Sequence, residues 1–201
     1  MKVYKISPVN YESNSYILTN DGKTAVIIDC ARPELYDICL SKNLKPVAVL
    51  LTHGHFDHVG GCKKFADNGV PIACGEGEKD FIFSEANLSI FGGVDIPYFE
   101  ISRTYSDGEE FETGGIKFKA ISTPGHTEGG VCYIAEDCIF TGDTLFFETV
   151  GRTDFPTGNS VKLAESLKKL AALDGDYKIY CGHFVETTLN HERLNNPFIK
   201  C

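Results

Sequence analysis

The sequence predicts an α/β sandwich with mixed β-sheets. Apolar segments of strand length occur in both halves of the chain, and in each half a helical pattern follows them. Short turn signals between neighbouring strands indicate hairpins, so antiparallel pairs should occur beside parallel ones. The chain has 201 residues, which is enough for one domain with a substantial core, and we expect residues 1–201 to form a single domain.

The first half of the chain alternates between expected strands and expected helices. Asp21-Gly22 is a hairpin signal between two of the strands. Pro33 suits the first turn of a helix, and Gly69 suits the position just after a helix end. The expected strands are 3–6, 15–18, 24–29, 46–52 and 71–74, and the expected helices are 33–43 and 60–68.

The middle of the chain, residues 75–102, has no clear periodicity and contains several aromatic residues and Gly92-Gly93. It is either a partly helical loop that covers a site or a surface excursion packed on the edge of the core. Regular patterns resume after it, including an amphipathic helix with Leu163 and Leu167 on one face. The expected strands are 109–112, 116–122, 131–134, 138–141 and 178–181, and the expected helices are 161–173 and 187–194.

The composition argues against several classes of protein. The formal net charge of −9 disfavours a nucleic-acid binder, because phosphate binding needs a basic face, although bound metal ions can still attract a small anion. Residues 1–10 contain no long apolar run, so we expect no signal peptide, no membrane anchor and a cytoplasmic location. The eight cysteines form no Cys-x-x-Cys pair, and we interpret them as buried free thiols rather than disulfides.

Four apolar strands each lead directly into a residue type that binds metal ions. These residues are His53, His126, Asp143 and His183. Strand ends are rigid and meet at one edge of a sheet, which is where α/β proteins build their sites. A glycine precedes the last three of the four residues and lets the backbone turn as it leaves the sheet.

The densest cluster of metal-binding side chains is the segment HGHFDH at residues 53–58. In an extended loop, residues two apart point the same way, so His53, His55 and Asp57 should line one side, with His58 added by a turn. One ion cannot use four groups from so short a segment, whereas two adjacent ions can share them. The segment therefore predicts a two-metal site.

Other histidine and aspartate positions are weaker signals when they are taken singly. Gly142-Asp143-Thr144 is also a turn sequence, and a lone histidine is often structural. The shared placement after strands is what joins Asp143, His126 and His183 to the cluster. His191 lacks that placement, because it lies in a polar helical segment, and we interpret it as structural or solvent-facing.

These motifs, in this order, resemble the metallo-β-lactamase superfamily. The resemblance extends from the strand at 26–29 to His183, and it is closest to the short glyoxalase II-like branch, whose members are similar to hydroxyacylglutathione hydrolase. The segments that carry it are THGHFDHVGG (52–61), PGHTEGG (124–130), TGDTLF (141–146), GRTDFP (151–156) and YCGH (180–183).

The resemblance implies a four-layer αββα sandwich of two mixed β-sheets with the metals at one edge. It also implies the ligand set, in which Asp143 bridges the two ions. Asp29 matches a position that supports the site from behind the ligands, although it also suits a turn after a strand. The implied ligands are His53, His55 and His126 for the first metal and Asp57, His58 and His183 for the second.

Several positions depart from glyoxalase II itself. We expect no counterpart of the C-terminal helical domain that grips glutathione, and Val185 stands where glyoxalase II has a tyrosine that contacts substrate. The chain is more similar to the short bacterial glyoxalase II-like hydrolases, but Phe184 replaces the small residue that is common there and would narrow the mouth of the pocket. Arg152 falls where the family has a basic residue near the substrate, but it could equally fix the loop at Asp154.

We therefore expect a hydrolase that uses two divalent metal ions, with zinc expected first and iron or manganese as alternatives. A hydroxide between the ions would attack a thioester or ester carbonyl, and the ions would stabilise the oxyanion. Asp57 would act catalytically by orienting this hydroxide. A thiolate leaves without much acid assistance, so a small-molecule thioester is the favoured substrate, with no nucleic-acid or membrane partner.

Three other functions remain as alternatives. A persulfide dioxygenase shares these motifs and binds one non-haem iron, here through His53, His126 and Asp143, and a metal count with an oxygen-uptake assay separates the two. A nucleic-acid phosphodiesterase on the same fold is disfavoured by the acidic charge. A non-catalytic metal-stabilised protein is disfavoured because a structural site needs four ligands rather than seven.

Overall fold

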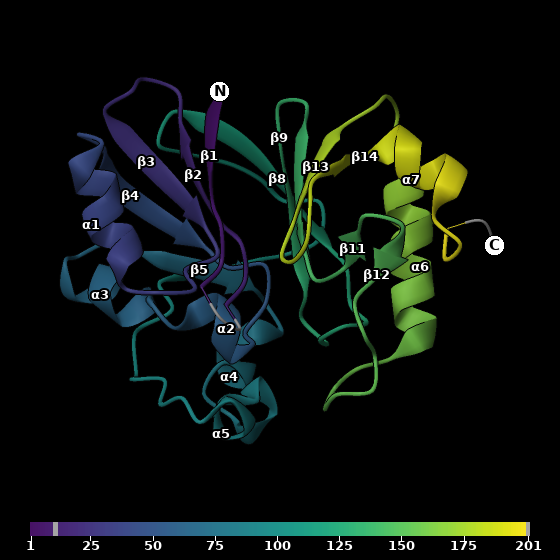
Figure 1. Ribbon diagram of the computed structural model, residues 1–201, viewed down its shortest axis with the longest axis horizontal. Coiled ribbons are helices and arrows are strands. Elements are labelled where there is room, and N and C mark those ends of the chain that lie inside the picture. The colour runs from purple at the N-terminus through teal and green to yellow at the C-terminus, as the bar shows by residue number, and fades with distance from the viewer. Residues whose placement is uncertain (10–11, 200–201) are drawn as a thin grey trace.

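The computed structural model describes residues 1–9 and 12–199, so Cys201 lies outside the described residues. Two six-stranded sheets face each other, and helices cover the outer face of each sheet (Figure 1). Each sheet contains both parallel and antiparallel pairs. The predicted four-layer αββα sandwich with mixed sheets is therefore confirmed.

The first sheet has the strand order β1-β2-β3-β4-β5-β6. Its first three strands pair antiparallel, and β3 to β6 pair parallel. The predicted turn at Asp21 joins β2 to β3, and its carboxylate accepts hydrogen bonds from the backbone N–H groups of Lys23 and Thr24. The strands are β1 Lys2–Ile6, β2 Ser15–Thr19, β3 Thr24–Ile28, β4 Lys45–Leu50, β5 Ile72–Gly75 and β6 Arg103–Tyr105.

The second sheet has the strand order β14-β13-β10-β9-β8-β7. Only β10 and β13 pair parallel, and the other pairs are antiparallel. A separate two-stranded hairpin, β11 with β12, follows the end of β10. The strands are β7 Glu110–Thr113, β8 Ile116–Ser122, β9 Val131–Ala135, β10 Cys138–Gly142, β11 Leu145–Phe146, β12 Thr149–Val150, β13 Lys178–Cys181 and β14 Thr187–Thr188.

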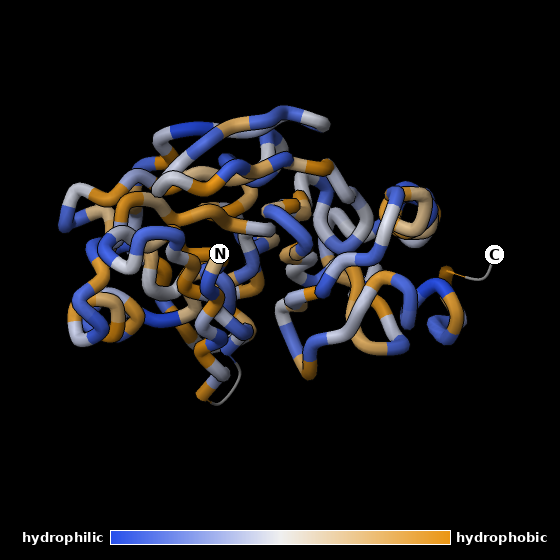
Figure 2. Tube along the Cα trace, turned by 90° about the horizontal axis from the view of Figure 1, so that it is seen from above, coloured by the Kyte–Doolittle hydropathy of each residue, from blue (hydrophilic) through white to orange (hydrophobic). Residues whose placement is uncertain are grey.

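Three hydrophobic clusters fill the spaces between the four layers. Tyr16 and Phe140 belong to the cluster between the two sheets, and Leu163 belongs to the one between the second sheet and its helices. The tube in Figure 2 alternates between hydrophobic and hydrophilic colours in the outer helices, as expected for helices with one face on a sheet. The helices are α1 Glu34–Ser41, α2 Phe56–Val59, α3 Cys62–Asp67, α4 Glu78–Phe81, η1 Glu85–Asn87, α5 Ser89–Gly92, α6 Ser160–Ala171 and α7 Leu189–Asn195.

The structure departs from the sequence prediction mainly in short elements. The single helix expected at 60–68 is preceded by a separate helical turn, α2, which carries Asp57 and His58. The strands β6, β11, β12 and β14 were not predicted, because two or three residues are too few to show a period-two pattern. Helix α7 begins at Leu189 rather than at residue 187, since Thr187 and Thr188 pair with β13 as β14.

The segment 75–102 is partly helical, as one of its two interpretations predicted. It forms α4, η1 and α5, which lie together with α2 at the lower edge of the sandwich in Figure 1. Among residues 1–9 and 12–199, no helix combines the length and the apolar character that a bilayer crossing requires.

Candidate functional site

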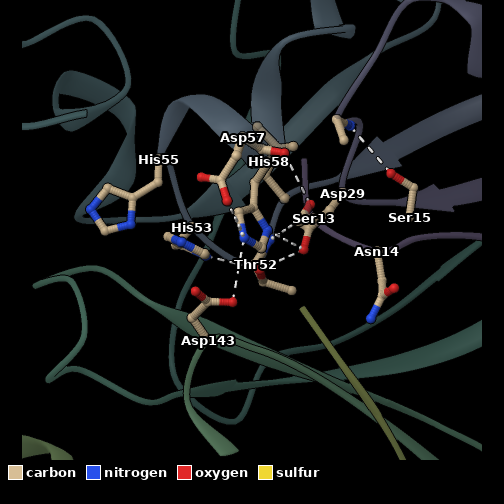
Figure 3. Close-up of polar contacts among 12 residues, drawn as sticks. Ser13, Asn14, Ser15, Asp29, Thr52, His53, His55, Asp57, His58 and Asp143 are labelled. Atoms are coloured by element: carbon tan, nitrogen blue, oxygen red, sulfur yellow. Dashed lines mark hydrogen bonds and ion pairs between the residues drawn. The ribbon is translucent and has the colours of Figure 1, made fainter. Parts of the chain in front are cut away.

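Seven side chains from four segments meet at the lower edge of the two sheets (Figure 3 shows five of the side chains). We call them the metal-ligand cluster. The first sheet contributes the segment after β4, and the second sheet contributes the segments after β8, β10 and β13. The structure thus brings together every side chain that the sequence nominated as a metal ligand: His53, His55, Asp57, His58, His126, Asp143 and His183.

The first group in the cluster contains His53, His55 and His126, whose ligand atoms lie within 4.8 Å of one another. Nδ1 of His55 and Nε2 of His126 are 2.9 Å apart. All three side chains are buried. His53 and His55 point to the same side of an extended segment, as predicted from their spacing of two residues.

The second group contains Asp57, His58 and His183. The expectation that Asp57 would share a side with His53 and His55 is wrong, because α2 begins at Phe56 and rotates Asp57 toward His183. Oδ2 of Asp57 lies 3.2 Å from Nε2 of His183. A helical turn therefore separates the short segment 53–58 into two ligand groups.

Asp143 lies between the two groups. Its Oδ2 is 3.6 Å from Nε2 of His126 and 3.3 Å from Nε2 of His183, and its Oδ1 is 3.4 Å from Nε2 of His58. Gly182 is required here for space, because a Cβ at that position would lie 2.2 Å from Oδ1 of Asp143. The carboxylate is thus placed where it could serve ligands on both sides.

Asp29 orients two of the histidines from behind (Figure 3). Its Oδ2 lies 2.8 Å from Nδ1 of His58 and accepts a hydrogen bond from the Thr52 hydroxyl, also at 2.8 Å. Because that hydroxyl donates to Asp29, it must accept from Nδ1 of His53, 3.2 Å away. In their neutral form both histidines therefore carry their proton on Nδ1 and turn a bare Nε2 toward the cluster.

His126 is oriented by the backbone rather than by a carboxylate. Its Nδ1 donates to the carbonyl oxygen of Arg152 at 2.8 Å, which leaves its Nε2 free for the cluster. The side chain of Arg152 points elsewhere. Its guanidinium donates twice to the carboxylate of Asp154, at 2.6 Å each, and lies over the ring of Phe155.

The electrostatics of the two groups differ. Burial, together with neighbouring histidines, lowers the pKa of His55 to about 3 and that of His53 well below its usual value. Burial alone would lower the pKa of His183, but Asp143 outweighs it and raises the pKa to about 9. His58 behaves in the same way, because Asp29, Asp57 and Asp143 together raise its pKa despite burial.

Burial raises the intrinsic cost of ionising Asp57 and Asp143, but the nearby histidines more than offset it. His58 and His183 lower the pKa of Asp57, and the same two histidines lower that of Asp143 well below its usual range. Both carboxyl groups are therefore ionised at neutral pH and present negative charge to the space between the groups.

Unpartnered buried atoms test whether a metal fits these residues. Among the residues that the structure describes, buried side-chain atoms without a hydrogen-bond partner occur only in the cluster: Nε2 of His53, His55 and His58, and Oδ1 of Asp143. Each such atom costs about 1–3 kcal/mol when nothing satisfies it. Divalent cations bound by Nε2 of His53 and of His58 and by Oδ1 of Asp143 would satisfy three of these four atoms, while His55 turns its Nδ1 toward His126, so the residues fit a metal centre.

Glu78 is a site residue that sequence reasoning missed. This buried carboxylate accepts hydrogen bonds from the backbone N–H of Gly54 at 2.7 Å, the hydroxyl of Thr127 at 2.5 Å and the backbone N–H of Gly129 at 3.1 Å. It thereby links the loop that bears His53 and His55 to the loop that bears His126. Burial raises its pKa to about 7. No period or motif in the segment 75–102 marks it.

A cavity of about 1290 Å³ opens directly above the cluster. Arg152 and Phe184, the two residues predicted to contact substrate, both line it, and so do Leu88, Phe91 and Val94 from the segment 75–102.

His191 is not part of the metal-ligand cluster. Its ring forms a hydrogen bond with Glu148 at 2.9 Å, which agrees with the interpretation of His191 as a structural residue. In the described part of the chain the cysteines are buried free thiols, and burial raises the pKa of Cys181 to about 12, which makes it a poor nucleophile.

Comparison with known proteins identifies the class to which this fold and site belong. A model of the metallo-beta-lactamase superfamily matches residues 10–183. A hydroxyacylglutathione hydrolase, GloC, from Haemophilus influenzae is 37% identical, with 97% of each chain covered. The crystal structure of the BLEG-1 B3 metallo-beta-lactamase has a TM-score of 0.92 at 30% identity over the whole of both chains.

A second solved structure bears on the metals. The di-iron-bound form of TTHA1623 has a TM-score of 0.85 at 30% identity, and the alignment covers 97% of this chain and 99% of that one. This chain belongs to the metallo-beta-lactamase superfamily, whose fold binds divalent metal ions and whose members are mostly hydrolases.

Proposed function

We propose that this protein is a hydrolase of small-molecule thioesters or esters that uses two divalent metal ions. The observation that carries the proposal is the arrangement of the metal-ligand cluster. Two groups of three ligands lie on either side of Asp143, and each group contains a buried histidine Nε2 without a partner that a cation would satisfy. A structural site would need one group of four ligands.

The first ion would be held by His53, His55 and His126, and the second by Asp57, His58 and His183, with Asp143 shared between them. When bound, two such ions supply Lewis acidity and lower the pKa of a water molecule toward neutrality. Zinc suits this mixture of imidazole and carboxylate. Iron and manganese are the alternatives, and the di-iron form of a relative at 30% identity supports iron.

Asp57 is the residue of the cluster that we propose to act on the nucleophile. Its carboxylate lines the cavity, and its lowered pKa keeps it ionised at neutral pH. An ionised carboxylate accepts a hydrogen bond from a water molecule and so fixes the direction of that water's lone pair. This orienting role is a contribution of position rather than of basicity.

The cavity favours a leaving group that departs without a proton donor. The two arginines that line it, Arg32 and Arg152, are each paired with a carboxylate, and the described lining contains no lysine. An amine leaving group needs an acid, whereas a thiolate does not, because a thiol has a pKa near 8.5. The name of the Haemophilus influenzae relative, a hydroxyacylglutathione hydrolase, also supports a thioester.

The proposal is tested by counting metals on protein purified without added metal, and then by assaying thioester hydrolysis with and without a chelator. We expect two metals per chain and hydrolysis that the chelator abolishes and added metal restores. One iron per chain, with oxygen uptake on a persulfide and no thioester hydrolysis, would replace the proposal with a dioxygenase built on His53, His126 and Asp143. Cleavage of a generic phosphodiester in place of a thioester would indicate a phosphodiesterase.

A further inference from the structure

The cavity above the cluster is larger than a short acyl group needs. Its volume is about 1290 Å³, whereas sites for whole drug-sized ligands measure roughly 300–1,000 Å³. Five phenylalanines line it, and they come from segments far apart in the chain. The cavity therefore has room, and an apolar surface, for a substantial part of a substrate besides the scissile bond. The five are Phe56, Phe91, Phe146, Phe155 and Phe184.

The charges in the cavity wall do not favour an anionic substrate. Nη1 of Arg32 lies 3.1 Å from Oε2 of Glu12, and the guanidinium of Arg152 forms two bonds to Asp154. Within residues 1–9 and 12–199, every arginine of the lining is therefore already paired. Glu34 adds a further negative charge to the same wall. A substrate part that carries carboxylates would meet acids here rather than free cations.

Two of the phenylalanines that line the cavity are exposed, and we call Phe91 and Phe184 the aromatic rim. Phe91 is 85% exposed and Phe184 is 67% exposed. Phe91 lies in α5, which packs tightly on α2, because a Cβ at Gly92 would lie 2.7 Å from the ring of Phe56. The exposed ring of Phe91 therefore belongs to a helix that packs directly against α2, the helical turn that carries Asp57 and His58.

Phe184 has a left-handed backbone conformation, and hydrogen bonds to its carbonyl oxygen hold it there. Its φ is +66°, in the left-handed region that costs a non-glycine residue about 1 kcal/mol or more. Its carbonyl oxygen accepts hydrogen bonds from Lys5 Nζ at 2.9 Å and Asn14 Nδ2 at 3.2 Å. The ring meets Phe146 edge to face at 5.5 Å. The backbone is strained, and the result is an exposed ring beside His183.

From this geometry we infer that the cavity binds an uncharged, apolar acyl chain between Phe91 and Phe184. The inference rests on the proposed function and adds to it a substrate class: thioesters or esters with medium-length apolar acyl groups and a neutral leaving group, in preference to small hydroxyacyl thioesters of glutathione. Burial of the acyl chain would cover two rings that are otherwise in water, and this supplies the binding free energy.

Binding is measured first, with probes that cannot be hydrolysed. The metal-loaded protein is titrated with S-alkyl-N-acetylcysteamine thioethers from methyl to octyl, and with S-octylglutathione, by calorimetry. We expect Kd to fall about two- to fourfold for each added methylene until the chain fills the cavity. S-octylglutathione should bind no more tightly than the neutral octyl thioether, because its carboxylates find no unpaired arginine and no lysine in the described lining.

Exposed neighbours of the rim provide matched controls. Phe91→Ala and Phe184→Ala should each raise Kd for the octyl thioether by about tenfold and leave Kd for the methyl thioether within twofold. Ile90→Ala and Val185→Ala remove exposed apolar side chains that lie next to the rim and outside the cavity. These controls should change neither value by more than twofold. Unfolding midpoints are compared for all four variants to verify that they fold alike.

Hydrolysis is measured separately, with octanoyl and acetyl thioesters of N-acetylcysteamine and with S-lactoylglutathione. Binding that does not depend on chain length, or that is much stronger for S-octylglutathione, overturns the inference whatever the enzyme hydrolyses. Hydrolysis that favours S-lactoylglutathione over octanoyl thioester overturns it as well, while leaving the proposed function in place. Chain-length-dependent binding that requires both rim residues, without hydrolysis of any thioester, supports the inference and contradicts the proposed function.

Discussion

The metal-ligand cluster and the aromatic rim lie on the same cavity but are built in opposite ways. The cluster is buried, and almost every polar atom behind it has a hydrogen-bond partner, such as Asp29 for His58 and the Arg152 carbonyl for His126. The rim consists of two exposed rings, and neither ring makes a polar contact. The orientation of the cluster is set by directional bonds, whereas the rim offers apolar area with no direction.

This difference predicts how each region responds to mutation. A change behind the cluster should alter metal binding, because directional bonds are lost one at a time and leave buried groups unpaired. A change at the rim should alter affinity for the apolar chain and leave metal binding unchanged. The predictions below begin with the change that should damage the cluster most.

Asp143→Ala should have the largest effect. It removes the carboxylate that lies within 3.6 Å of His58, His126 and His183, so the two ligand groups lose the ligand that they would share. We expect less than one metal per chain by elemental analysis and a loss of hydrolysis of at least about a thousandfold. Two retained metals in this variant would show that Asp143 is not a shared ligand.

Asp29→Asn should weaken metal binding by about ten- to a hundredfold. The amide oxygen can keep the backbone N–H of Thr52, which now bonds Oδ1 at 2.8 Å, but the NH₂ then faces Nδ1 of His58. His58 must move its proton to Nε2 and can no longer present a lone pair there. Asparagine tolerates the φ of +54° at this position, so the fold should persist.

Competition with a chelator measures the affinity of the Asp29→Asn protein. Asp37→Asn, an exposed position in α1, is the control and should bind metal as the unmodified protein does. Unchanged affinity in the Asp29 variant would mean that His58 does not depend on this carboxylate for its tautomer.

Glu78→Gln should have a smaller effect, a loss of metal affinity of about tenfold. Glutamine has one acceptor oxygen, which can keep Gly54 or Gly129 but not both, so one backbone N–H loses its partner and the two ligand loops are no longer fixed to each other. The control is Glu76→Gln, an exposed carboxylate that bonds only Ser106 among the described residues. If the Glu78→Gln protein binds metal as tightly as the Glu76→Gln control, the hydrogen bonds of Glu78 do not contribute to metal binding.

His191→Ala should have the smallest effect. The ring bonds Glu148 at 2.9 Å and stacks on Phe147, and none of these three residues lines the cavity. We expect metal content and hydrolysis within twofold of the unmodified protein, and a change in the free energy of unfolding of less than about 1 kcal/mol, as for other partly exposed pairs. Loss of metal would show that the ligand assignment is wrong.

Much of the fold could be predicted because its signals are local. Strands such as β8 and β10 are long apolar segments with turn residues at their ends, and the amphipathic pattern of α6 was recognised to within a few residues. Two-residue strands carry no such signal, since their pairing is decided by the partner strand. The helical turn α2 was also missed, because a segment of four residues is too short to display a helical period.

The nominated ligands meet in the structure because each follows a strand, and the order of strands in a sheet constrains where strand ends lie. Glu78 and the carbonyl of Arg152 could not be found in this way. Glu78 acts through three hydrogen bonds to loops far away in sequence, and any residue type can supply a backbone carbonyl. Phe91 was visible only as one aromatic residue among several in an irregular segment.

The sequence by itself determined which side chains could bind metal and at which ends of strands they would lie, since hydrophobic period and residue chemistry are properties of short segments. The tertiary structure alone decided how α2 turns Asp57 toward His183, which nitrogen of each histidine faces the cluster, and what surrounds the cavity above it. These depend on hydrogen bonds and close contacts between segments that are distant in the chain, such as Asp29 with His58 and Lys5 with Phe184. Such contacts leave no pattern in either segment, because each partner is favourable only once the other is in place.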